Sequence, residues 1–200
     1  MMNLKKTFIF YLVILLGCIA SVSYASSSPK EQMKTSVDAI INILKNKELD
    51  QKTRRKKIRL IIKKRFDFWA MSQRTMATNW KKLSSREKKR FVTLFTRFLV
   101  NNYMKRIEAY TDETIEYPKE KIKENRAMVN TVILTKSVDI PVMYKMRLKK
   151  GEWMVYDVVI EGISLIKNYR SSYKEIVKKK GLGELMTMLE KKIKDNQTKY

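Results

Sequence analysis

The carboxylates Asp157 and Glu161 have the spacing in this sequence that most suggests acid–base chemistry. Both fall on one face of a predicted strand, where a four-residue separation places them roughly 13 Å apart at the standard rise. The paired carboxylates of glycosidases lie closer together. Since ion-paired acids are the usual structural case, we expect Asp157 to neutralise a nearby base, with Arg170 a candidate partner, and Asp67 to do the same.

The sequence does not contain the residue types that most other enzyme chemistry needs. Its 200 residues include no histidine and a single cysteine, Cys18, which excludes His-dependent triads and the usual zinc sites of nitrogen and sulfur ligands. The five glycines form no recognisable phosphate-binding loop. We therefore predict that the protein is not an enzyme, and we expect neither a metal nor a cofactor.

The N-terminal segment has the pattern of an export signal. A short basic start precedes an apolar run over residues 7–20, and Ser23 and Ala25 supply small residues at the −3 and −1 positions of a cleavage site. The run is short for a membrane span. We expect residues 1–25 to be a cleaved signal peptide and residues 26–200 to form one domain.

Cys18 offers an alternative way of processing the same segment. It follows Leu15-Leu16-Gly17, which resembles the lipobox of bacterial lipoproteins. Leu16 is bulkier than usual at its position, and a good cleavage site follows at Ala25. Lipidation of Cys18 is therefore the less favoured interpretation.

The chain is strongly basic. Its 44 lysine and arginine residues and 20 acids give a formal net charge of +24, which falls to about +22 without the two lysines of the signal. Such a charge suggests nucleic acid or an anionic membrane surface as a partner. Export argues against nucleic acid, so we expect no such partner, and attraction to a membrane stays open.

A strand that leads directly into a helix organises the second half of the sequence. Residues 153–161 alternate in period two, Gly162 ends that pattern, and apolar residues then recur at helical spacing from Leu165, with Ser164 as a plausible N-cap. Strict alternation would place on one face Met154, Tyr156, Val158 and Ile160, and on the other Trp153, Val155, Asp157 and Val159.

Local signals predict helices before and after a sheet. Capping boxes at Ser28 and Ser84 and a cap at Asp50 begin three helices, and another helix follows Gly181. From about residue 114 the pattern changes to strands, whose short connections favour an antiparallel meander of about four strands. This order of elements indicates an α+β fold.

Several segments together carry a resemblance to a known family. They are Phe66-Asp67-Phe68, Met71, Trp80, the helix with Phe91, Phe95, Leu99 and Tyr103, and above all residues 153–170, WMVYDVVIEGISLIKNYR. From about residue 30 to residue 192 the chain resembles the MlaC family, the periplasmic phospholipid-binding proteins of the toluene-tolerance type. One departure is Met76-Ala77, where the family often has a Leu-Gly pair.

The resemblance implies a lipid carrier in the periplasm of a Gram-negative cell. In this family the acyl chains lie between sheet and helices, and the headgroup stays near the solvent. The implied partners are an outer-membrane lipoprotein complex and an inner-membrane ABC transporter with an MCE-domain subunit, between which phospholipid is shuttled to maintain outer-membrane lipid asymmetry. The implied cargo is a bound phospholipid and the implied state a monomer.

Two alternatives stay open at this point. The fold could carry another lipid, such as a hopanoid. The chain could instead be a basic exported scaffold that binds anionic membrane surfaces without extracting lipid, which predicts salt-sensitive binding alone.

Strand and helix faces nominate the residues of an apolar lipid pocket. We predict that the acyl tails contact Phe68, Phe95, Phe98, Leu99, Tyr144, Met146, Tyr156, Val158, Ile160, Ile163 and Ile166. Arg147 and Arg170 are candidates to meet the phosphate of a headgroup, although a structural role is favoured for Arg170.

Overall fold

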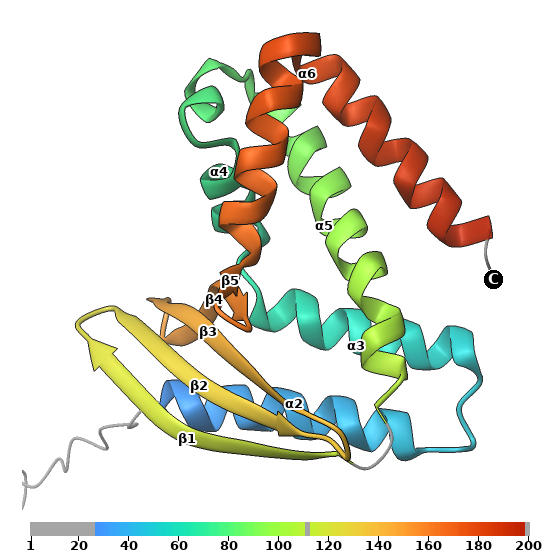
Figure 1. Cartoon of the computed structure of the whole chain (residues 1–200), viewed down its shortest axis with the longest axis vertical. Coiled ribbons are helices and arrows are strands. Elements are labelled where there is room, and N and C mark those ends of the chain that lie inside the picture. The colour runs from blue at the N-terminus through green and yellow to red at the C-terminus, as the bar shows by residue number, and fades with distance from the viewer. Residues whose placement is uncertain (1–26, 111–112, 199–200) are drawn as a thin grey trace, which may run out of the picture.

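A computed structural model describes residues 27–110 and 113–198, which form an α+β fold, as predicted. The expected signal peptide, with its cleavage site and Cys18, lies outside the described residues. In Figure 1 an antiparallel sheet has helix α2 (Pro29–Lys45) running along it. Three further helices are gathered to one side of the sheet: α4 (Phe68–Met76), α5 (Ser85–Glu108) and α6 (Leu165–Thr198).

Local side-chain caps begin the helices that precede the sheet. Ser28 with Glu31, and Ser84 with Glu87, form reciprocal capping boxes, and the Asp50 side chain accepts a hydrogen bond from the backbone N–H of Thr53. All three predicted caps are confirmed. The helices that follow α2 are α3 (Gln51–Arg65), α4 (Phe68–Met76), the 3-10 helix η1 (Ala77–Lys82) and α5 (Ser85–Glu108).

The junction between α4 and η1 has an unusual backbone at Ala77. Its φ of 48° and ψ of −121° lie in a region that glycine adopts without cost and residues with a Cβ rarely adopt. The family that the sequence resembles often has glycine at this position. This chain forms the turn with alanine, in a backbone conformation that favours glycine.

The sheet is a meander of five antiparallel strands in sequential order. We predicted about four strands; the additional strand is a two-residue one, formed because Glu161 and Gly162, both at positive φ, turn the chain back so that Ile160 pairs with Ile163. The strands are β1 (Thr114–Lys123), β2 (Arg126–Leu134), β3 (Asp139–Lys149), β4 (Glu152–Ile160) and β5 (Ile163–Ser164).

The chain ends in α6 (Leu165–Thr198), which Gly181 divides into two segments. Gly181 has a φ of 83°, outside the helical range, so the helix changes direction there and a second segment begins, as predicted. Figure 1 shows the two segments joined by a sharp bend at the top of the molecule. Buried Leu185, Leu189 and Ile193 turn the second segment toward α5.

Candidate functional site

Buried apolar side chains form three clusters in the described part of the chain. The sheet cluster consists of Met33, Ala127, Val129, Val142, Met146, Trp153, Val155 and Val158, with Tyr144 and Ile160 at its margin. The helix cluster lies between α4, α5 and α6 and includes Phe91, Phe95, Phe98, Leu99, Ile166 and Leu189. The α3 cluster consists of Ile58, Ile62, Val100 and Met104. Phe66, in the linker between α3 and α4, packs against all three clusters.

A β-bulge decides which side chains of β4 reach the sheet cluster. Met146 pairs with Val155, but the preceding residue of β3, Lys145, pairs with Asp157, so Tyr156 is the extra residue on β4. The bulge places Val155 and Val158 on the same inner face. Our expectation that these two residues point to opposite faces was wrong, because strict alternation assumes a strand without a bulge.

Tyr156 itself lies apart from the three clusters. The Arg74 guanidinium sits 4.3 Å from the centroid of its ring, and the Arg126 guanidinium 6.0 Å from it. Both distances are within the range of cation–π attraction. The ring therefore contacts two cations, one from α4 and one from β2.

Aromatic rings in the helix cluster stack along α5 and α6. Phe91 and Phe95 are stacked with centroids 5.5 Å apart, and Tyr169 meets Phe95 and Phe98 edge-on at 5.7 and 5.6 Å. Burial raises the pKa of the Tyr169 phenol to about 12. The phenol is therefore neutral at physiological pH and compatible with an apolar environment.

The predicted tail-binding residues divide between two of these clusters. The helix cluster contains Phe95, Phe98, Leu99 and Ile166, with Phe68 at its margin. The sheet cluster contains Met146 and Val158, with Tyr144 and Ile160 at its margin. Ile163, with 63% of its surface exposed, and Tyr156 belong to neither. A pocket lined by the predicted set would have to lie where the two clusters meet, beside Phe66.

Asp67 holds one of the two arginines predicted to meet a headgroup. Arg147 Nε donates to Asp67 Oδ2 at 3.1 Å, the Arg147 Nη2 also contacts that oxygen, and Lys149 Nζ lies 3.1 Å away. Burial opposes ionisation of Asp67, but hydrogen bonds from the Ala70 backbone N–H, Arg147 and Lys149 outweigh it and hold the pKa of Asp67 below its usual value. The expectation that Asp67 neutralises a base is confirmed.

Asp157 neutralises a nearby base, as expected, but that base is Lys145 and not the candidate partner Arg170. Asp157 accepts hydrogen bonds from the Ser164 hydroxyl at 2.8 and 3.0 Å and lies 3.4 Å from Lys145 Nζ. Arg170 Nε donates instead to the backbone carbonyl of Arg74 at 2.7 Å. Asp157 lies in β4, and its carboxylate accepts a hydrogen bond from the backbone N–H of Ile166 at 3.2 Å, in the first turn of α6. Arg170 lies more than one turn further along that helix and contacts α4.

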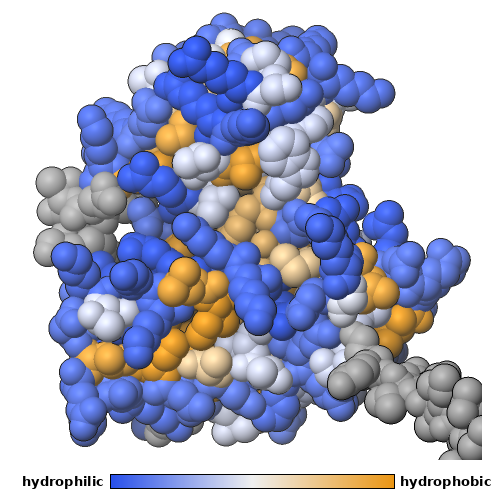
Figure 2. All heavy atoms as spheres, turned by 180° about the vertical axis from the view of Figure 1, so that it is seen from behind, coloured by the Kyte–Doolittle hydropathy of each residue, from blue (hydrophilic) through white to orange (hydrophobic). Residues whose placement is uncertain are grey.

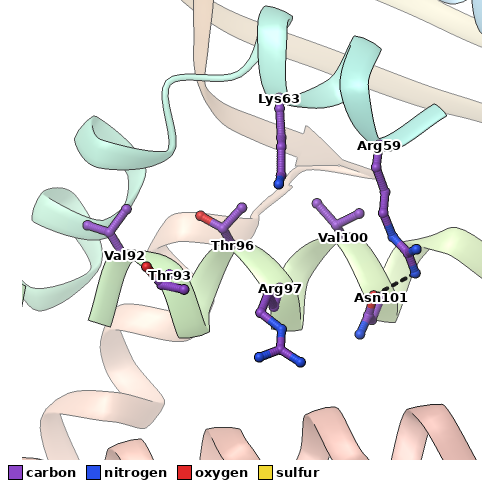
Figure 3. A pocket seen from close by; sticks show the side chains of 8 residues that line it. All are labelled: Arg59, Lys63, Val92, Thr93, Thr96, Arg97, Val100 and Asn101. Carbon is purple, nitrogen blue, oxygen red and sulfur yellow. Dashed lines mark hydrogen bonds between the residues drawn. The ribbon is translucent and has the colours of Figure 1, made fainter. Parts of the chain in front are cut away.

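A groove between α3 and α5 provides a cavity of about 460 Å³. This volume is within the roughly 300–1,000 Å³ of small-molecule sites. Figure 3 shows Lys63 extending from α3 toward Thr96 of α5, and Arg59 reaching across to donate to Asn101 Oδ1. The groove is lined by Arg59, Lys63, Val92, Thr93, Thr96, Arg97, Val100 and Asn101.

The groove combines apolar, hydroxyl and cationic side chains. Val100 belongs to the α3 cluster, so part of the groove's wall is formed by the buried core. Lys63 and Arg97 bring positive charge to it, and no described acid forms an ion pair with either. The sequence did not predict this site. The α3 segment shows a basic pattern and the α5 segment an apolar stripe, and neither pattern indicates that the two helices pack against each other.

Residues 27–110 and 113–198, which the structure describes, contain neither a candidate membrane span nor a candidate metal site. None of their helices has the length and hydropathy needed to cross a membrane. Their histidine, cysteine, aspartate and glutamate side chains form no group of three that could hold a metal ion.

Comparisons with known proteins agree with the fold. The family described as MlaC protein matches residues 34–191. The intermembrane phospholipid transport system binding protein MlaC of Haemophilus influenzae is 22% identical, over 95% of this chain and 94% of its own length. A phospholipid-binding protein from Ralstonia solanacearum, solved in complex with a phospholipid, aligns with a TM-score of 0.77 and 18% identity, covering 86% of this chain and 99% of that chain. Since the family match spans most of the sequence, this protein belongs to the MlaC family.

Proposed function

We propose that this protein is a periplasmic phospholipid carrier of a Gram-negative envelope. The family match over residues 34–191 is the observation that carries the proposal. It is supported by the names of the two similar proteins, one belonging to an intermembrane phospholipid transport system and the other solved with a phospholipid. In this proposal the chain is exported by a signal peptide at residues 1–25, acts as a monomer and catalyses no reaction.

The proposed partners are an outer-membrane lipoprotein complex and an inner-membrane ABC transporter with an MCE-domain subunit. A carrier is needed because two acyl tails with about thirty methylenes, at roughly 0.8 kcal/mol each, do not pass through water at a useful rate. Exchange of lipid with these two complexes would maintain the lipid asymmetry of the outer membrane.

We place the acyl tails between the sheet cluster and the helix cluster, beside Phe66. Val158 is buried in the sheet cluster and Phe95 in the helix cluster, so entry of a lipid between the clusters would separate them. Met71 and Met146, one in each cluster, have flexible side chains that can repack around an alkyl chain.

We place the phosphate of the headgroup in the groove between α3 and α5. Arg147 and Arg170, the residues nominated from sequence, already donate hydrogen bonds to Asp67 and to the Arg74 carbonyl. Lys63 and Arg97 line the groove, and no described acid forms an ion pair with either of them. They are therefore better placed than Arg147 and Arg170 to meet a phosphate.

Native mass spectrometry of the mature protein, purified from cells without detergent, tests the proposal. We expect an added mass that matches one diacyl phospholipid and is released by organic solvent. Extraction then identifies the cargo and separates a phospholipid from a hopanoid. A bare polypeptide mass, with no lipid gained on incubation with vesicles, would contradict the carrier and favour the basic scaffold.

A further inference from the structure

The outward face of α3 presents one leucine surrounded by lysines. Leu60 has 59% of its surface exposed, and lysines occupy the four positions that neighbour it on a helix: Lys56, Lys57, Lys63 and Lys64. All four are exposed. The helix contains no acidic residue. We call Leu60 and these four lysines the α3 face.

The arginines of α3 are used within the protein, whereas the lysines of the α3 face are not. Arg54 donates to backbone carbonyls, Arg55 pairs with Glu108 at 2.6 Å, and Arg59 donates to Asn101. Arg65 donates to Ser36, Gln32 and the Trp153 carbonyl. No described acid forms an ion pair with the four lysines.

The α3 face is held in place by the opposite side of the helix. Ile58 is fully buried and Ile62 nearly so, and Arg65 fixes the end of the helix to α2 and β4 through buried hydrogen bonds. The lysines are therefore displayed on a rigid helix. Like charges one turn apart disfavour a helix, so an anionic surface that neutralises them would be bound favourably.

We propose that the α3 face docks on an anionic phospholipid bilayer. Lysines with long apolar stems around one exposed leucine match the interfacial helix pattern, in which the apolar side chain enters the headgroup layer and the ammonium groups stay among the lipid phosphates. A surface that binds individual carboxylates is better served by arginine, whose planar guanidinium can donate two hydrogen bonds to one carboxylate, and the α3 face contains no arginine. In Figure 2, which shows one side of the molecule, hydrophilic side chains cover much of the surface between smaller hydrophobic patches.

Docking in this way would also position the groove. Lys63 belongs both to the α3 face and to the lining of the groove between α3 and α5, so the groove opens at the edge of the docked surface. This consequence rests on the proposed function, since only a carrier needs its cavity beside the bilayer. Binding to the bilayer itself does not require that the protein carries lipid.

The test is flotation of the mature protein with vesicles. The probes are vesicles of phosphatidylethanolamine with phosphatidylglycerol, and neutral vesicles of phosphatidylcholine. The first variant combines K56Q, K57Q and K64Q, and its matched control removes the same charge from α6 with K178Q, K179Q and K180Q, all exposed. The second variant is Leu60→Gln, with Val138→Gln, 57% exposed, as its control.

We expect wild-type protein to bind the anionic vesicles and not the neutral ones. The α3 triple variant should bind roughly 100-fold more weakly, from about 1 kcal/mol per lysine near an anionic leaflet. Leu60→Gln should weaken binding severalfold, both controls should bind nearly as wild type, and raising the ionic strength from about 0.1 to 1 M should abolish binding.

Three results would overturn the proposal. Equal losses in the α3 and α6 triple variants would mean diffuse attraction by net charge. Unchanged binding by the α3 triple variant would mean that another surface contacts the bilayer. Failure of the wild-type protein to bind anionic vesicles would exclude a bilayer and favour an acidic protein as the partner of the α3 face. Native mass spectrometry of the same preparations distinguishes failure of the docking proposal from failure of the carrier proposal. An α3 variant that no longer binds vesicles but keeps its bound lipid supports docking through the α3 face and leaves the carrier proposal intact.

Discussion

The backbone N–H of Asp67 donates a hydrogen bond to the carbonyl oxygen of Val155 at 2.8 Å. This contact fixes the start of α4 to the middle of β4 and forms part of a parallel bridge between Phe66 and Val155. It places Phe66 where the sheet cluster, the helix cluster and the α3 cluster meet. The junction that we propose for the acyl tails is therefore defined by backbone as well as by packing.

Asp67 should make the stability of the fold depend on pH in the acid range. Its pKa is lower in the folded protein than the value of about 3.9 in an unfolded chain, so its contribution is fully present above that value and is lost as the pH falls through the folded pKa. We expect urea unfolding to show a free energy that falls below about pH 4 more steeply in wild type than in Asp67→Asn. Parallel curves for the two proteins would contradict this role.

Ala77→Gly should stabilise the protein. Alanine at a φ of 48° carries backbone strain of about 1–3 kcal/mol. Relief of this strain exceeds the free-energy cost of the extra conformational entropy that glycine gives the unfolded chain. We therefore expect the free energy of unfolding to rise by about 1 kcal/mol. The control is Ala109→Gly, at an exposed position with an ordinary φ of −76°, where the same change should destabilise slightly. A loss of stability in Ala77→Gly would show that the turn is not strained.

Ser164→Ala should cost more than a usual N-cap substitution. The Ser164 hydroxyl accepts from the Lys167 backbone N–H at 3.1 Å and donates to the buried carboxylate of Asp157. Losing both contacts should lower the free energy of unfolding by about 2 kcal/mol, against about 1 kcal/mol for Ser84→Ala at an exposed cap. If denaturant titrations gave equal losses of unfolding free energy for Ser164→Ala and Ser84→Ala, the hydrogen bond from Ser164 to Asp157 would contribute no stability.

A charge at the proposed tail site should abolish lipid loading. Val158→Glu and Tyr144→Glu each place a carboxylate in the sheet cluster, one of the two clusters proposed to enclose the tails. Lipid per protein should fall at least roughly tenfold, because an uncompensated carboxylate costs the loaded state several kcal/mol. Native mass spectrometry measures the loading, and circular dichroism checks that the variants fold.

Val138→Glu provides the matched control for these two variants. It introduces the same charge at an exposed position outside the three clusters, and it should keep the wild-type complement of lipid. A folded Val158→Glu protein that purifies with as much lipid as this control would show that the tails lie elsewhere.

The sequence by itself determined the elements and their order. The caps at Ser28, Asp50 and Ser84 and the break at Gly181 are confirmed because each depends on residues within one turn of one another. The meander followed from connections too short for any other pairing. The family could also be recognised, since its segments are continuous in the chain.

Only the tertiary structure decided how these elements meet. The bulge at Tyr156 exists in the pairing of two strands, and it overturned the inside-outside assignment of β4. Asp67 and Arg147 are 80 residues apart, and the groove joins faces of α3 and α5 that each look ordinary alone. Such contacts depend on packing between distant segments, and a periodic pattern within one segment cannot specify which distant partner it meets.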